Sequence, residues 1–284
     1  MKFTNKHLLL AACFQLAQIY SQQASAANLI TNGDFSITNA GIINQQIGVS
    51  HPLVAGGAAA LVTGWTSGSI ANPLTPRNDA ESNLNVIYGP GDADGIGATT
   101  KFTPAGDLFP APDSSGNNKR IAFYSFANSP GLAGTSVFPS SSPDGGNYLA
   151  LDGAAGVGPM SQQLNGLTLG SQYELSFYWA AAQQKGYVAA NGLTELLKVS
   201  LGGQSISTAQ IAYPQYTFQD WRKVTMTFTA DAVNPILSFL SVGTPSGAPP
   251  FALLDGVSLN AVPEPSAALL GALGALALLR RRRN

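Results

Sequence analysis

The chain has 284 residues and 45% of them are hydrophobic, so it holds enough apolar side chains for a packed core and is not a disordered protein. Charged residues make up only 10%, whereas glycine (31 residues) and proline (18 residues) are abundant, which is typical of a turn-rich extracellular protein. Between residues 27 and 262 there are eight basic and fourteen acidic side chains, a balance of −6, and this excludes a nucleic-acid groove built from clustered lysine and arginine.

Residues 1–26 have the order of a secretory signal peptide. Two lysines precede the apolar run LLLAACFQLAQIY, and the small residues Ala24-Ser25-Ala26 follow it. We therefore expect an N-terminal signal helix that signal peptidase removes after Ala26 or Ala27. A second interpretation stays open, because Leu10-Ala11-Ala12-Cys13 matches a lipobox, whose cysteine would carry a lipid anchor. If Cys13 leaves with the signal, the mature chain has no cysteine, which excludes disulfides, thiolate metal sites and cysteine nucleophiles.

Residues 27–260 are expected to form one all-β domain, an antiparallel β-sandwich with long Pro/Gly loops. Short runs of alternating apolar and polar residues are separated by clusters of Gly, Pro, Asn and Ser. The clearest strands are residues 173–180 and 222–229, and further strands are expected at 29–32, 147–151, 197–201, 236–240 and 252–259. The segment 66–146 contains nine prolines, so it is expected to form long loops with one buried strand at 121–126.

The sequence offers no recognisable catalytic machinery. His51 is the one histidine left in the mature chain, and there is no Gly-x-Ser-x-Gly elbow, nucleotide-binding glycine motif or zinc-ligand spacing. We therefore expect a non-enzymatic protein with no catalytic residues. A secreted glycan hydrolase stays as an alternative, since a glycosidase needs only two carboxylates.

Sugar binding would need exposed aromatic faces that stack on the apolar faces of the sugar. Trp65 and Tyr187 lie in predicted loops, and Trp221 begins a strand on its polar, threonine-bearing face. These three are the candidate ligand-binding residues. Trp179 is in phase with apolar residues of its strand and is assigned to the interior.

Five segments together resemble the galactose-binding-like jelly rolls of carbohydrate-binding modules: NLITNGDFS (28–36), GGNYLALDG (145–153), LTLGSQYELSFYWA (167–180), FQDWRKVTMTFTA (218–230) and PPFALLDGVSL (249–259). The resemblance implies a jelly-roll sandwich and a structural Ca²⁺ that joins the first strand to the last, with Asn32, Asp34 and Asp255 as its matching ligands. Ser36 and Gly256 stand where such modules commonly carry acidic residues, so two potential ligands are missing. The alternative is that the three matching residues end turns and bond their own backbone.

Residues 261–284 combine Val262-Pro263-Glu264-Pro265, an apolar run of thirteen residues and the cluster Arg280, Arg281, Arg282 and Arg283. As a helix the run would cover about 20 Å of a hydrocarbon core of about 30 Å, so we expect a short transmembrane helix with the arginines on the cytoplasmic side. This order resembles the PEP-CTERM sorting signal of Gram-negative bacteria. The resemblance implies an exosortase-type membrane protease as a partner, with export to the cell envelope, the cell surface or an extracellular matrix rich in exopolysaccharide.

The sequence thus predicts an exported surface or matrix protein, associated with exopolysaccharide and biofilm, whose body binds carbohydrate. A structural or adhesive surface protein without a sugar pocket is the competing hypothesis.

Overall fold

The computed structural model describes residues 27–39, 45–47, 61–68, 84–89, 123, 142–154, 157–184, 188–246, 248 and 250–263. Within the chain, Leu29–Leu259 forms one compact unit. No helix in the described part is long and apolar enough to cross a membrane. The expected signal helix and C-terminal apolar segment lie outside the described residues.

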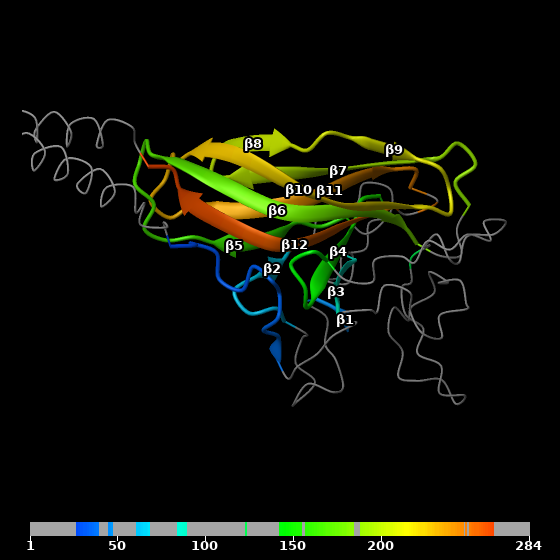
Figure 1. Ribbon diagram of the computed structural model, residues 1–284, viewed down its shortest axis with the longest axis horizontal. Helices are drawn as coiled ribbons and strands as arrows, with labels where there is room; N and C mark the ends of the chain where they lie inside the picture. Colours follow the sequence, from blue (N-terminus) through cyan, green and yellow to red (C-terminus); the bar gives the residue numbers. More distant parts are fainter. Residues whose placement is uncertain are drawn as a thin grey trace, which may run out of the picture. The chain divides into compact units, whose positions relative to one another are not determined.

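Two antiparallel sheets make up the unit (Figure 1). The first sheet has the order β1-β3-β4-β12-β6-β10 and consists of β1 (Gln45–Gln46), β3 (Asn85–Tyr88), β4 (Tyr148–Asp152), β12 (Pro250–Ala261), β6 (Gln172–Gln183) and β10 (Phe218–Thr229). The second has the order β2-β5-β11-β7-β8, with β9 also paired to β7, and consists of β2 (Thr66–Ser67), β5 (Met160–Gln163), β11 (Ile236–Thr244), β7 (Leu193–Leu201), β8 (Gln204–Ser207) and β9 (Ile211–Tyr213). The prediction of an all-β antiparallel sandwich is confirmed.

The main core lies between the two sheets, and the alternation seen in the sequence produces it. On β6, Leu175 and Phe177 are buried, and in the β6–β10 register they stand opposite Met226 and Val224. Phe239 of β11 packs edge-on against Phe177 with ring centroids 5.2 Å apart, so the two sheets meet through aromatic contact. The outward-facing residues between them, such as those of the Thr-rich face of β10, are exposed.

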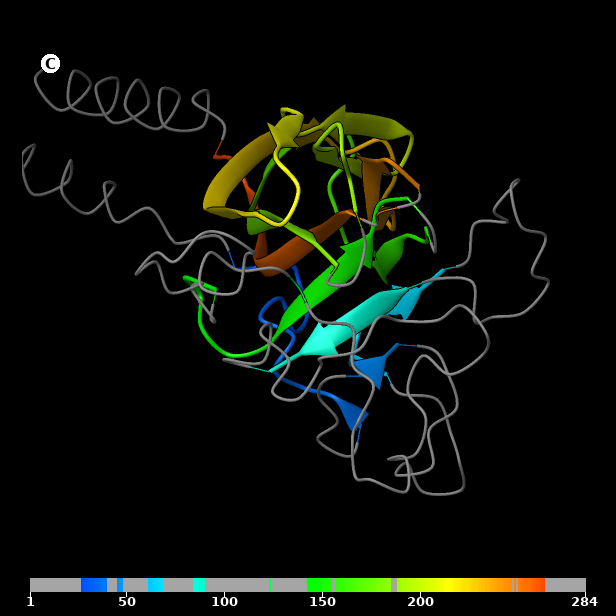
Figure 2. The same cartoon turned by 90° about the vertical axis from the view of Figure 1, so that its right-hand side faces the viewer.

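A second buried cluster lies on the other face of the first sheet. Tyr88 and Tyr148 stack with centroids 5.5 Å apart, and Phe123 packs against Phe251 at 5.0 Å. Phe123 also forms an isolated bridge with Gln184, and it is the one described residue of the expected strand 121–126. Because this sheet is buried on both faces, β3 and β4 are continuously buried and do not alternate. Figure 2 shows β4, β3 and β1 leading away from β12 as successive neighbours.

The expected strand at residues 29–32 is wrong. Leu29 does pair with the last strand, its backbone N–H donating to the Leu259 carbonyl at 2.9 Å, but no strand continues from it. Asn32 and Phe35 adopt φ angles of 54° and 52°, which turn the chain sharply. The chain also forms β3 within the proline-rich segment, where the sequence predicts loops.

Candidate functional site

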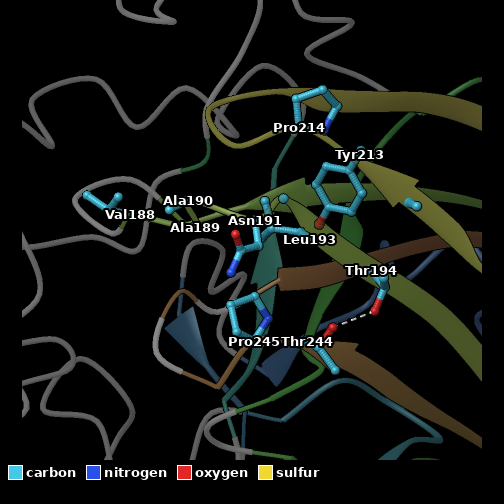
Figure 3. A pocket seen from close by; sticks show the side chains of 12 residues that line it. Val188, Ala189, Ala190, Asn191, Leu193, Thr194, Tyr213, Pro214, Thr244 and Pro245 are labelled. Atoms are coloured by element: carbon cyan, nitrogen blue, oxygen red, sulfur yellow. Dashed lines mark hydrogen bonds between the residues drawn. The ribbon is translucent and has the colours of Figure 1, made fainter.

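A cavity of about 600 Å³ opens at one end of the sandwich, where loops connect β7, β9 and β11 (Figure 3). Its lining is nearly evenly divided between polar and apolar surface and includes the exposed Pro214 and Pro245 above the buried Leu193 and Tyr213. The polar groups that line it are the Asn191 side chain and the hydroxyls of Thr194 and Thr244, which hydrogen bond to each other at 2.7 Å. In Figure 3 the Asn191 side chain lies between the Tyr213 ring and Pro245. Apolar surface combined with a few polar groups is a general feature of small-molecule sites.

The cavity wall depends on a tight turn before β7. The Gly192 N–H donates to the Ala189 carbonyl at 2.8 Å, and Gly192 has a φ of 78°. A Cβ at this position would come within 2.9 Å of the Tyr213 carbonyl oxygen, so only glycine lets the turn approach β9 this closely. The Ala189 N–H is held in turn by the Gln215 side-chain oxygen at 3.1 Å.

A buried carboxyl group, Glu195, lies directly behind this wall. Its Oε1 accepts hydrogen bonds from the Ser241 hydroxyl (3.0 Å), the Val242 N–H (3.1 Å) and the Leu196 N–H (3.0 Å), while Oε2 has no partner. Burial raises the pKa of Glu195 well above its usual value, and the nearby Asp152 raises it further. Both carboxyl groups are fully buried, so neither reaches a substrate at the surface as a glycosidase pair would require.

The second unusual carboxyl group is Asp255, which is fully buried although the other charged groups near it are acidic. The pKa of Asp255 is raised from 3.8 to about 8, chiefly by burial, with smaller contributions from the repulsion of Asp144 and Asp34. The Ser142 hydroxyl and the Gly256 N–H lie near enough to favour its charged form, but neither carboxylate oxygen has a hydrogen bond of normal geometry. Unsatisfied carboxylate oxygens in such a position call for a cation or a proton.

The three residues expected to bind a metal are only partly brought together. Asp34 is exposed and lies close enough to Asp255 for repulsion, but the Asn32 side chain is committed to the backbone: its Nδ2 donates to the carbonyls of Ile37 (2.9 Å) and Thr63 (3.0 Å). Its Oδ1 accepts from the Ile37 N–H at 2.9 Å, so Asn32 supports a turn. Among the described residues, no three acidic or histidine side chains stand close enough to chelate a metal ion by themselves.

Asp144 and Ser142 were not among the expected site residues. Both lie in the loop before β4, where the Asp144 N–H contacts the Ser142 hydroxyl at 3.3 Å. The Gly256 backbone approaches Asp144 so closely that a Cβ would lie 3.0 Å from the Asp144 Cβ. No local sequence pattern connects this loop with the end of the chain, because the pairing of β4 with β12 creates the contact.

The candidate ligand-binding aromatics have different environments. Trp65 is only 4% exposed, packs against Phe35 with centroids 5.3 Å apart, and donates its indole N–H to the Asn32 carbonyl at 3.0 Å. The expectation of an exposed ring is therefore corrected: Trp65 is a core residue. Trp221 lies on the outer face of β10 as expected, but it is half-buried and packs edge-on against Tyr148 at 5.6 Å. Tyr187 lies outside the described residues and directly precedes Val188, which lines the cavity.

Of the sorting-signal residues, Val262 and Pro263 are the last described positions and follow β12. Glu264, Pro265 and the four arginines lie outside the described residues, so the sorting signal stays a prediction.

No family model matches the chain, and no curated protein matches it. Among solved structures it is similar to the carbohydrate-binding module TmCBM61 bound to β-1,4-galactotriose, with 12% identity over 84% of this chain and 100% of that chain and a TM-score of 0.35. It is also similar to the N-terminal cellulose-binding domain of β-1,4-glucanase C from Cellulomonas fimi, with 19% identity over 41% of this chain and 80% of that chain and a TM-score of 0.28. An arabinose-bound α-L-arabinofuranosidase matches with 13% identity over 84% of this chain and 27% of that chain, at a TM-score of 0.36. These likenesses are distant and carry no argument about the ligand or the activity of this chain.

Proposed function

We propose that the chain is an exported, non-enzymatic protein that binds carbohydrate in the cavity at the end of the sandwich. The cavity itself carries the proposal: about 600 Å³ of space combines apolar surface with the Asn191 amide and the hydroxyls of Thr194 and Thr244. An amide and hydroxyl groups both donate and accept, as sugar hydroxyls do. Pro214 and Pro245, which are both exposed, supply apolar surface for the C–H faces of a sugar ring, whereas Tyr213 is buried beneath them in the core.

Within the compact unit, the cavity and the two chain ends lie at opposite ends of β12. Leu29 pairs with Leu259 near the end of β12, so both ends of the unit lie there. The cavity lies near the start of β12, where Pro250 accepts from Gly153, and the Gly153 carbonyl accepts from Gly243. Leu259 lies nine residues along β12 from Pro250, a distance of about 30 Å for an extended strand.

Export by signal peptidase and sorting by an exosortase-type membrane protease belong to the same proposal. They rest on the order of basic, apolar and small residues at the N-terminus and on Val262-Pro263-Glu264-Pro265 followed by an apolar run and arginines. Mass spectrometry of the mature termini tests both steps and also decides whether Cys13 carries a lipid.

We further propose that Asp255 is the carboxylate ligand of a structural Ca²⁺, with Asp144 and Asp34 adding negative charge nearby without chelating the ion as a set of three. The support is the orphaned Asp255 carboxylate, beside which two more carboxylates raise the local negative charge. Calcium takes six to eight oxygen ligands, including hydroxyls, backbone carbonyls and water, so the Ser142 hydroxyl and nearby carbonyls are available to complete the set. When bound, the ion would neutralise the cluster and join the last strand to the loop before β4.

The function is tested by binding of the purified full-length chain to a panel of polysaccharides. Replacing Asn191 with Ala and Thr244 with Val removes the amide and one hydroxyl of the cavity, and we expect each change to weaken glycan binding about tenfold. Thr227→Val, on the exposed face of β10, is the matched control. A panel in which no glycan binds would favour a structural or adhesive protein, and glycan turnover by the pure chain would favour a hydrolase.

A further inference from the structure

A second groove, separate from the end cavity, lies between the edge strands of the two sheets. β10 ends the first sheet and β8 ends the second. A groove of about 240 Å³ lies between them, with Trp179, Ile206, Thr208, Arg222, Val224 and Thr225 among its lining residues. This volume lies below the usual range for drug-sized ligands, so it suits a single ring and not a chain of rings.

The Gln204 side chain closes one end of this groove. Gln204 of β8 donates from its amide to the Thr229 carbonyl of β10 and accepts from the Thr229 N–H at 3.3 Å. The Gln204 side-chain amide thereby bonds to the Thr229 backbone as a neighbouring strand would, and it links β8 to β10. Further along, Thr208 accepts from the Leu197 N–H at 3.0 Å, which leaves its own hydroxyl proton free to donate into the groove.

Arg222 is the charged group of the groove. Its guanidinium carbon lies 5.7 Å from the Trp179 ring centroid, a cation–π contact that holds the planar group in place. Its Nε–H makes a long contact with the Asp220 carbonyl at 3.5 Å, and among the described residues no carboxylate pairs with the guanidinium. The terminal NH₂ groups are therefore available for a carboxylate, which a guanidinium binds through two parallel hydrogen bonds.

The other lining groups fit a ring that carries this carboxylate. Ile206 is 37% exposed and Val224 is half-buried, so together they give apolar surface to the C–H face of a ring. The Thr208 hydroxyl can bond to a ring hydroxyl, whereas Thr225 directs its side chain to the outer face of β10. Trp179 lines the groove as well, and its buried indole N–H has no acceptor. A guanidinium, a hydroxyl and an apolar side match a uronic acid better than a neutral sugar, because only the uronic acid offers the exposed Arg222 a charged partner for two parallel hydrogen bonds.

We infer that the groove between β8 and β10 is a second binding site, which takes one uronic acid residue of an acidic polysaccharide through Arg222. The ligand class rests on the proposed function, but the site is independent of the end cavity. An edge strand also benefits from an inward-pointing charge that prevents aggregation, and this is the competing role for Arg222.

The test is isothermal titration of the full-length chain with polygalacturonate, with free galacturonate, and with whichever neutral glycan the panel identifies. Arg222→Gln is expected to weaken binding of polygalacturonate and galacturonate at least tenfold and to leave the neutral glycan unaffected. Arg222→Lys keeps the charge but loses the paired hydrogen bonds, so we expect an intermediate loss. Lys198→Gln, an equal charge change on the outer face of β7, is the control and should bind like the unmodified chain.

Three results would overturn the inference: equal losses in Arg222→Gln and Lys198→Gln, no uronate binding by the unmodified chain, or equal binding of an acidic peptide of aspartates. Aggregation of Arg222→Gln with unchanged uronate binding would assign Arg222 to edge protection. If Arg222→Gln unfolds, the titration of Arg222→Lys with galacturonate replaces it as the test: weaker binding supports the site, and unchanged binding overturns it. Loss of neutral-glycan binding in Asn191→Ala with uronate binding retained would separate the two sites.

Discussion

Replacing Asp255 with Asn should have opposite effects in the absence and in the presence of calcium. Asn has the size of Asp but carries no charge, so it removes the buried carboxylate whose two oxygens have no partner. Without metal, we expect Asp255→Asn to stabilise the protein at neutral pH. With calcium, the unmodified chain should gain stability and the variant should not.

The magnitude follows from the pKa of Asp255, which burial raises from 3.8 to about 8. Below pH 3.8 both the folded and the unfolded states hold the proton. As the pH rises, the unfolded state releases the proton first, so folding stability falls until the pH reaches the folded-state pKa. At pH 7 this covers about three pH units at ~1.4 kcal/mol each, an upper limit of about 4 kcal/mol. For a unit of this size that corresponds to a rise of roughly 10 °C in the Tm of Asp255→Asn.

Thermal unfolding at pH 7 with chelator and with millimolar calcium is the assay, and Glu174→Gln on the exposed face of β6 is the matched control. Calcium at a hundred times its Kd should stabilise the unmodified chain by about 2.7 kcal/mol. Because Asp255 keeps its proton at pH 7 without metal, calcium binding should also release a proton, seen as a buffer-dependent heat in titration. The reasoning is refuted if Asp255→Asn melts with the unmodified chain in chelator, or if calcium raises the Tm of both equally.

Two further predictions concern the end cavity. With calcium present, the stability of the unmodified chain should fall as the pH rises from 4.5 toward the raised pKa of Glu195, because the unfolded state loses its proton first. Denaturant melts of Glu195→Gln should therefore show a flatter dependence of stability on pH. Parallel pH profiles for the two proteins would count against a neutral Glu195. Gly192→Ala places a Cβ 2.9 Å from the Tyr213 carbonyl, whereas Gly166→Ala, at nearly the same φ of 77°, meets nothing within 4 Å. In denaturant melts, the left-handed backbone alone should lower the free energy of unfolding of each variant by about 1 kcal/mol. Gly192→Ala should lose clearly more than Gly166→Ala because of the added contact with the Tyr213 carbonyl, and only Gly192→Ala should also lose glycan affinity.

The sequence predicts best those strands that have one polar face. β6 and β10 alternate clearly, because one face packs in the core and the other is exposed along most of β10. β3 has no alternation, since all four of its residues are buried between two clusters, and a proline-rich surrounding hides it further. Its place in the sheet comes from pairing with β4, which a single segment does not reveal.

The site residues also divide into those that a single segment of sequence identifies and those that only the tertiary structure brings to the site. Asp255 is identified from its segment by resemblance, but Asp144 and Ser142 reach it only because the loop before β4 lies beside the end of the last strand. Asn191 and Thr244 are far apart in the sequence and meet at the cavity through loops of different strands. Trp65 has the polar, glycine-flanked setting of a surface loop, yet its ring packs against Phe35 and Phe239. Tertiary packing decides each of these positions.

Glu195 and Asp255 are both fully buried acids with raised pKa values, but their surroundings assign them different roles. Glu195 has three fixed donors from β7 and β11 on one oxygen, so its hydrogen bonds hold two strands in register whether or not a ligand binds. Asp255 has the Ser142 hydroxyl and the Gly256 N–H nearby but no hydrogen bond of normal geometry, and its charged neighbours, Asp144 and Asp34, repel it. Although Oε2 of Glu195 has no partner, the three bonds to Oε1 give this residue a structural role in the fold. Asp255, whose two oxygens have no hydrogen bond of normal geometry and which lies next to two exposed carboxylates, needs either a proton or a cation, and an oxygen-seeking divalent cation has the required charge and coordination.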